Sequence, residues 1–188
     1  MILLEGTRQL PDNDRPALVA LGRLLAMELP QAVFRTGNAS GADTAFAEGV
    51  MQVNARRLQY VLPQNRMGRQ RMTPLAYAVS FDQLSAQAGN RVAEATFAAT
   101  PANQRLVDHY QQTSRPTAGR AKAAYLLRDT LKVLGSPEAG LAPATVGVFY
   151  VNEHDPLGGG TGHTIRVCLQ HAVSVLTQNH WRAWLPSK

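Results

Sequence analysis

The chain of 188 residues has a single cysteine, Cys168, which excludes an internal disulfide framework. It also has no apolar run near the ~18–20 residues that a membrane-spanning helix requires. Its N-terminus lacks the basic segment and long apolar core of a signal peptide. We therefore expect a cytoplasmic protein that does not enter a membrane, because a lone cysteine fits a reducing compartment.

Lysine is scarce too, since the 19 basic residues comprise sixteen arginines and three lysines. The formal net charge is +6 and the pI is near 10.0, a balance that favours anionic ligands. Arginine makes planar, bidentate contacts with phosphate, although the codon preference of a GC-rich bacterial genome explains the same bias equally well. Hydrophobic residues make up 45% and charged residues 17%, which is ordinary for one globular domain of this length.

Metal ligands and cofactor motifs are missing as well. His109, His154, His171 and His180 have no metal-ligand spacing, and no pair of cysteines supports zinc. Cys168 lies among apolar neighbours, which favours a small buried hydrophobe over a nucleophile. We expect neither a metal nor a cofactor.

Short apolar segments alternate with segments of helical periodicity. We expect strands at residues 2–5, 32–36, 58–62, 144–151 and 173–177. Helices are expected at residues 14–29, 42 to about 53, 82–100, 100–112, 117–134 and 161–171. An alternative for the helix at 82–100 is a break at Gly89. Asp14 and Thr100 are the expected N-caps of the helices that they precede, each with a proline in the first turn. The tail at Trp181 is expected to pack against the sheet or a partner.

This alternation predicts an α/β fold, a Rossmann-like open parallel sheet of about five strands in the order 3-2-1-4-5. We expect a single domain with its core at residues 1–63 and 143–180. An ordinary crossover between parallel strands needs about a dozen residues. Residues 64–142 are therefore expected to be a helical insertion between strands 3 and 4.

Three of the expected strands end in turns rich in small residues, at 6–8, 37–43 and 158–164. In an open parallel sheet, ligands bind at the carboxyl ends of the strands, where the strand order reverses. Unpaired N–H groups and the positive end of a helix dipole suit phosphate. We expect the three turns to form one crevice.

These motifs, Gly-Thr-Arg, Gly-Asn-Ala-Ser-Gly-Ala-Asp and Gly-Gly-Thr-Gly-His-Thr, resemble the SLOG superfamily of Rossmann-like proteins. That group includes the lonely-guy phosphoribohydrolases, often mislabelled as lysine decarboxylases, and the Rossmann domain of the DNA-processing protein DprA. The resemblance implies nucleotide binding and dimers formed through helices. Lonely-guy enzymes carry Pro-Gly-Gly-x-Gly-Thr-x-x-Glu at the third turn, and Arg166 stands at the position of their catalytic glutamate. The phosphate cradle therefore carries over, but the catalytic acid does not.

The candidate ligand-binding residues come from the three turns and the helix that follows the last of them. They are Gly6, Thr7, Arg8, Gly37, Asn38, Ser40, Gly41, Gly158, Gly159, Gly160, Thr161, Gly162, Thr164 and Arg166. Arg35, at another strand end, is a weaker phosphate candidate. The candidate catalytic residues are Asp43, His163 and Glu5. Asp43 is equally well explained by its favourable position at a helix N-terminus, and His163 by capping.

Three functions remain as hypotheses. The first is a sensor or binding module for a nucleotide or a nucleotide-derived ligand, with Asp43 on the ribose. The second is an enzyme that hydrolyses the N-glycosidic bond of a nucleoside monophosphate. The third is nucleic-acid binding through Arg56, Arg57, Arg66, Arg69 and Arg71.

Overall fold

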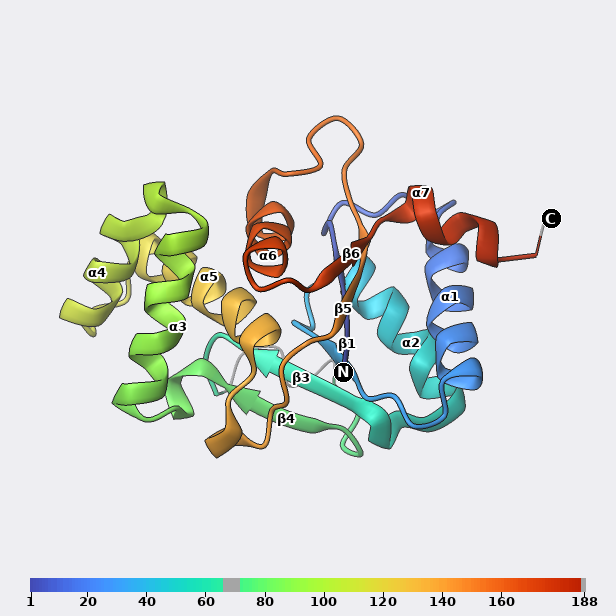
Figure 1. Cartoon of the computed structure of the whole chain (residues 1–188), viewed down its shortest axis with the longest axis horizontal. Coiled ribbons are helices and arrows are strands. Elements are labelled where there is room, and N and C mark those ends of the chain that lie inside the picture. The colour runs from blue at the N-terminus through green and yellow to red at the C-terminus, as the bar shows by residue number, and fades with distance from the viewer. Residues whose placement is uncertain (66–71, 187–188) are drawn as a thin grey trace.

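A computed structural model, which describes residues 1–65 and 72–186, contains one parallel sheet in the order β4-β3-β2-β1-β5-β6 (Figure 1). The predicted Rossmann-like parallel sheet is thus confirmed, and its five expected strands keep their expected relative order. The strands are β1 (Ile2–Gly6), β2 (Phe34–Thr36), β3 (Leu58–Leu62), β4 (Tyr77–Ser80), β5 (Val146–Tyr150) and β6 (Ser174–Leu176).

The strand β4 is a correction to the predicted helical insertion. It pairs in parallel with β3 and extends the sheet at its edge, with Val61 opposite Val79. Four residues are too few for a clear alternation, and this is why the strand was not expected. The helix expected from residue 82 starts at residue 86 instead, because residues 81–83 form a 3-10 turn closed by a capping box between Ser80 and Gln83. That helix continues through Gly89 without a break.

Helices cover both faces of the sheet. On one face lie α1 (Arg15–Glu28), α2 (Ala42–Asn54) and the short α7 (Gln178–Trp181). On the other lie α3 (Ala86–Ala99), α4 (Gln104–Gln112), α5 (Ala118–Leu134) and α6 (Gly159–Gln170) (Figure 1). Trp181 is fully buried against Phe46 and Tyr150, so the expected packing of the tail on the sheet is confirmed. None of the described helices is long and apolar enough to cross a membrane.

Two of the expected helix caps are wrong in detail. Asp14 occupies the N-cap position of α1, but its side chain accepts a hydrogen bond from the Tyr150 hydroxyl instead of from the helix. Thr100 also makes no side-chain cap, and its hydroxyl contacts α6 instead. In contrast, Thr117 caps α5 by accepting from the backbone N–H of Arg120 at 3.0 Å.

The side chains of β1 alternate between the two faces of the sheet, as the period of a strand requires. Leu4 packs on the side of α1 and α2, whereas Leu3 packs with Cys168 on the side of α6. Cys168 is fully buried, which confirms its expected role as a core residue. The same alternation turns Glu5 toward α5 and α6, at the end of the strand where the sheet meets its connecting turns.

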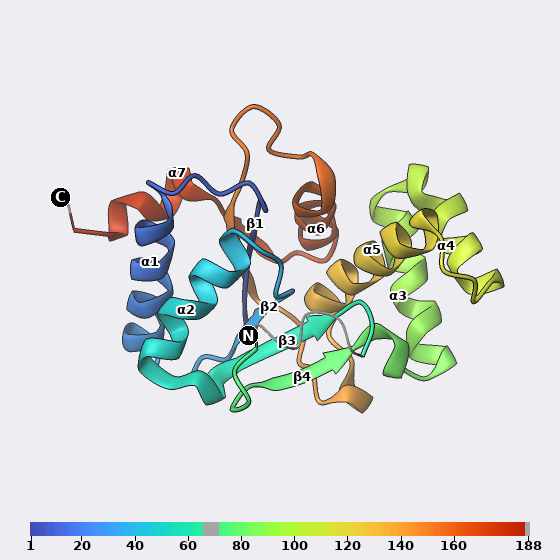
Figure 2. The same ribbon diagram turned by 180° about the vertical axis from the view of Figure 1, so that it is seen from behind.

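Helices α1 and α2 cross at very close range, side by side on their face of the sheet (Figure 2). A Cβ at Gly49 would lie 2.0 Å from the carbonyl oxygen of Val19 and 2.6 Å from the backbone N of Arg23. Gly89 in α3 is a matched control, because among the described residues a Cβ there has one contact within 4 Å, Phe81 Cζ at 3.8 Å.

We predict opposite effects of alanine at these two positions. Gly49→Ala lowers the free energy of unfolding by ~1–3 kcal/mol, because backbone cannot yield to the added methyl group. Gly89→Ala leaves it unchanged or raises it by up to ~1 kcal/mol through helix propensity. Urea denaturation checks both values, and equal stabilities of the two variants would contradict the close packing.

Candidate functional site

A cavity of ≈ 730 Å³ lies at the carboxyl ends of β1 and β5. These two strands are neighbours, and the chain leaves them in opposite directions, toward β2 on one side and β6 on the other. The cavity is therefore at the switch point of the sheet, where α/β proteins bind ligands. It is lined by residues 5–8, Ala39, Asp43, Thr100, Asn103, Lys122, Tyr125, Leu126, Arg128, Asp129, Asn152, Asp155, Pro156, residues 158–161 and Arg166.

The N-terminus of α6 supplies backbone donors to one wall of this cavity. The helix begins at Gly159, two residues earlier than expected, with Gly158 as its N-cap. The N–H groups of Gly159, Gly160 and Thr161 have no acceptor among the described residues, as is usual for a first turn. A Cβ at Gly162 would lie 1.9 Å from the carbonyl oxygen of Leu157, so only glycine permits this tight entry into the helix. The turn thus directs unpaired donors at the cavity.

Three cations around the cavity have no acidic partner in the part of the chain that the structure describes. Arg166 donates from Nε to Thr100 Oγ1 at 3.1 Å and from Nη1 to the carbonyl oxygen of Leu157 at 2.9 Å. The guanidinium carbon of Arg8 lies 4.9 Å from the centroid of the Tyr125 ring. Lys122 is exposed at the same rim. Their unneutralised charge favours an anionic ligand.

The carboxylate of Asp43 is occupied by the backbone. Its Oδ1 accepts from the N–H of Gly6 at 3.2 Å, and its Oδ2 accepts from Gly37 at 3.1 Å and from Ala39 at 3.2 Å. Gly41 adopts a φ of +86° and approaches the carbonyl oxygens of Thr7 and Arg8. Asp43 therefore holds the first two turns against each other, and its oxygens are already satisfied without a ligand.

Beneath the cavity, Glu5 on β1 belongs to a buried cluster of charges whose other members lie on α5. Lys132 Nζ lies 2.6 Å from Glu5 Oε2 and 2.9 Å from Asp129 Oδ1, and Arg128 Nη2 lies 2.5 Å from the same Asp129 oxygen. The hydroxyl of Thr164 on α6 donates to Glu5 Oε1 at 2.9 Å. Lys132 thereby links β1, at the centre of the sheet, to α5, which lines the cavity.

The pKa values in this cluster follow from burial and charge balance. Burial raises the pKa of Glu5 to about 8, more than Lys132 lowers it, and the nearby Asp129 and Asp43 raise it further. Burial also disfavours the charge on Asp129, but Arg128 and Lys132 outweigh this and hold its pKa below the usual range. Two cations thus face three carboxylates, and protonation of Glu5 brings the buried cluster to neutrality.

His163 lies outside the cavity, although it follows the glycine turn. Its side chain is buried, with Nδ1 3.0 Å from Thr100 Oγ1 and Nε2 3.0 Å from Thr130 Oγ1. Burial lowers its pKa, and the charge of Arg166 acts in the same direction. This environment holds His163 as a neutral side chain that joins α6 to α3 and α5.

The remaining predicted site residues divide into two groups. Gly6, Thr7, Arg8, residues 158–161 and Arg166 line the cavity. Gly37, Asn38, Ser40, Gly41, Gly162 and Thr164 do not line it, and the second turn contributes only Ala39 and Asp43. Arg35 is buried in the sheet, where it donates to Gln59 Oε1 and to the carbonyl oxygen of Lys132.

One wall of the cavity was not predicted at all, and it comes from α5. Lys122, Tyr125, Arg128 and Asp129 line it from this helix, together with Thr100 and Asn103 from the end of α3 and the turn after it. The available signal was the polar group Arg128-Asp129 and Lys132 within an otherwise apolar helix face. Such charges rarely stay buried without partners.

Comparisons of the chain with protein-family models, with curated proteins and with solved structures give no significant match. The resemblance to the SLOG superfamily rests on the turn motifs alone.

The buried carboxyl of Glu5 predicts a distinct pH dependence of stability. Unfolded glutamate has a pKa of about 4.3, whereas burial raises that of Glu5 to about 8. Between these values the folded chain binds more protons than the unfolded chain, so Glu5 makes unfolding easier as the pH rises. Glu5→Gln removes this effect. The variant gains stability relative to the wild type from pH 5 to 8, by at most ~1.4 kcal/mol per pH unit, and the difference is constant above pH 8.

Denaturant unfolding from pH 4 to 9 measures this difference. Glu94→Gln is the control, because Glu94 is exposed on α3 and makes no hydrogen bond or ion pair within the described residues. A Glu5→Gln difference that does not change with pH would show that Glu5 titrates normally.

Proposed function

We propose that the protein binds a nucleotide or a nucleotide-derived ligand at the cavity between β1, β5 and α5, as a sensor or binding module. The observation that carries this proposal is the coincidence of two features at one place. The first turn of α6 presents three unpaired N–H groups, and Arg8, Lys122 and Arg166 surround the same cavity without acidic partners among the described residues. A phosphate group satisfies both features.

The size and composition of the cavity support a ligand larger than phosphate alone. Its volume of ≈ 730 Å³ lies within the roughly 300–1,000 Å³ that small-molecule sites occupy. Besides charged groups, the lining includes Tyr125, Leu126 and Pro156. These side chains offer apolar surface for a base or another uncharged portion of the ligand.

Binding is tested by thermal denaturation with a panel of nucleotides. A nucleotide at 100 times its Kd adds ~2.7 kcal/mol of stability, which raises the Tm by about 5–10 °C for a chain of this size. We predict that Arg166→Ala weakens the binding by about 10–100-fold, because a charge-assisted hydrogen bond is lost. The same nucleotide concentration then stabilises the variant by about half as much or less.

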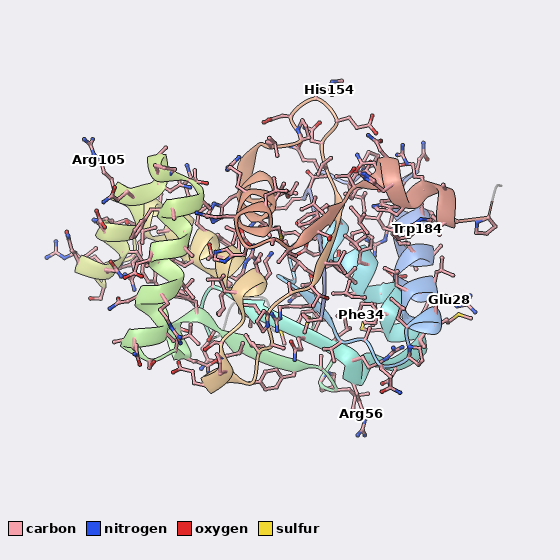
Figure 3. All side chains as sticks on the ribbon, viewed as in Figure 1. Glu28, Phe34, Arg56, Arg105, His154 and Trp184 are labelled. Atoms are coloured by element: carbon pink, nitrogen blue, oxygen red, sulfur yellow. The ribbon has the colours of Figure 1, made fainter. Side chains whose placement is uncertain are left out.

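Arg105→Ala is the matched control for charge. Arg105 points into solvent from α4 (Figure 3) and does not line the cavity, so its loss should leave the Tm shift unchanged. Absence of stabilisation by any nucleotide in the wild type would contradict the proposal.

Hydrolysis of the N-glycosidic bond of a nucleoside monophosphate is the second candidate function. It is favoured by Glu5, whose carboxyl lies at the cavity and is protonated near neutral pH because burial raises its pKa to about 8. In this reaction Glu5 donates a proton to the leaving base as the C–N bond breaks. Water adds its hydroxyl to the anomeric carbon and returns its proton to the carboxylate.

We predict that, if this activity exists, Glu5→Gln abolishes the release of free base while nucleotide binding remains. Chromatography of nucleoside monophosphates after incubation with the protein measures the release. A wild type that binds a nucleotide but releases no base would contradict this second function and leave the binding proposal standing.

Nucleic-acid binding through the arginine cluster gains no support from the described residues. Arg57 donates to the carbonyl oxygens of Ala26 and Leu29 and thus caps the end of α1. Arg66, Arg69 and Arg71 lie outside the described residues. Formation of a homodimer through helices stays a prediction, which sedimentation analysis tests.

A further inference from the structure

One carboxylate oxygen at the cavity has no hydrogen-bond partner among residues 1–65 and 72–186. Asp129 on α5 is 1% exposed, and all of its bonds are made by Oδ1. That oxygen lies 2.9 Å from Arg128 Nε, 2.5 Å from Arg128 Nη2 and 2.9 Å from Lys132 Nζ. Oδ2 makes none, and Asp129 lines the cavity. The fold therefore leaves one acceptor on a buried, firmly held side chain for a ligand.

This acceptor lies directly beside the first turn of α6. A Cβ at Gly160 would lie 3.0 Å from Asp129 Oδ2, so the absence of a side chain at Gly160 leaves the oxygen uncovered. Gly159, Gly160 and Thr161, whose N–H groups have no acceptor among the described residues, line the same cavity. A phosphate bound there would have Asp129 as its neighbour.

Charge decides which chemical group can lie against Asp129. The pKa of Asp129 is lowered because Arg128 and Lys132 outweigh its burial, so the group is an anion at neutral pH. An ionised carboxylate accepts hydrogen bonds, donates none and repels phosphate oxygens, so the phosphate of the ligand is not its partner. A neutral hydroxyl is the donor that suits it. Asp43 offers no equivalent site, because its two oxygens already accept three backbone N–H groups.

We propose that Asp129 recognises the hydroxyl groups of a sugar whose phosphate binds at the N-terminus of α6. A phosphorylated pentose carries an anion and neutral hydroxyl donors a few bonds apart, and this wall offers N–H donors for the one and a carboxylate acceptor for the other. The inference rests on the proposed phosphate site. It restricts the ligand to a phosphorylated ribose that keeps its hydroxyl groups, and it disfavours the deoxy sugars. It also gives α5, which belongs to the segment between β3 and β5, a role in specificity.

The test changes the ligand, so that folding of the protein is not at issue. Each of the four ribonucleoside 5′-monophosphates is compared with its 2′,3′-dideoxy counterpart by titration calorimetry on the wild-type chain. We expect the dideoxy compounds to bind about tenfold more weakly or worse, because a hydrogen bond to a charged acceptor is lost. Equal affinities for both series would overturn the inference and leave the phosphate site standing. If neither series binds, the phosphate site itself is wrong.

Two variants then identify the residue that distinguishes the two series. Asp129→Asn should lose most of the discrimination, because the amide oxygen stays on Arg128 and Lys132 and an NH2 donor replaces the free Oδ2. Asp155→Asn should keep it, because Asp155 lies in the exposed loop before α6, also at the cavity. Loss of discrimination in Asp155→Asn but not in Asp129→Asn would show that Asp155 binds the sugar, and it would contradict the role proposed for Asp129. If Asp129→Asn does not fold, the wild-type comparison still tests recognition of the sugar hydroxyls, and Asp155→Asn still tests the alternative carboxylate.

Discussion

The ammonium group of Lys132 holds the two halves of the binding site together. It lies between Glu5, at the end of the central strand β1, and Asp129, on the helix α5 that faces that strand. A buried lysine is tolerated only with such partners, and removal of the ionised Asp129 would leave its charge uncompensated. Because Arg128 adds a further bond to Asp129 and another at 3.1 Å to the carbonyl oxygen of Gly37, the same cluster also fixes the position of the second turn. The walls of the cavity are therefore set by electrostatics as well as by apolar packing.

Much of the fold could be predicted from local patterns. The strand at Leu58–Leu62 is visible as a largely apolar run closed by Pro63, and the helix ending at Leu134 as a periodic apolar face closed by Gly135. The strand at Tyr77–Ser80 could not be predicted, because an edge strand of four residues is stabilised by its pairing with β3 and carries too little periodicity of its own. Similarly, Asp14 follows the rule for an N-cap, but the hydroxyl of Tyr150, far away in the sequence, competes for its carboxylate.

The site was predictable only where it depends on the topology of the parallel sheet. Gly6, Arg8 and the turn at Gly158 follow strands that the pattern places side by side, and they do line the cavity. The wall formed by α5 depends on long-range charge pairing, and the sequence shows the charged residues on this helix but not their partners elsewhere in the fold. Asp43 and His163 were predicted as catalytic residues from their type and their position at a turn, but their side chains make hydrogen bonds that stabilise the fold. Asp43 accepts three backbone N–H groups, and His163 lies between two threonine hydroxyls.

The central claim is that the N-terminus of α6 binds a phosphate group. The most direct measurement is an NMR titration of the ¹⁵N-labelled protein with inorganic phosphate and then with ribose 5-phosphate, followed at the backbone amides. If phosphate binds there, the largest shifts occur at Gly159, Gly160 and Thr161, and they saturate at lower concentrations of the sugar phosphate. Shifts that are absent there, or that are largest on the opposite face of the sheet at α1 and α2, would contradict the claim.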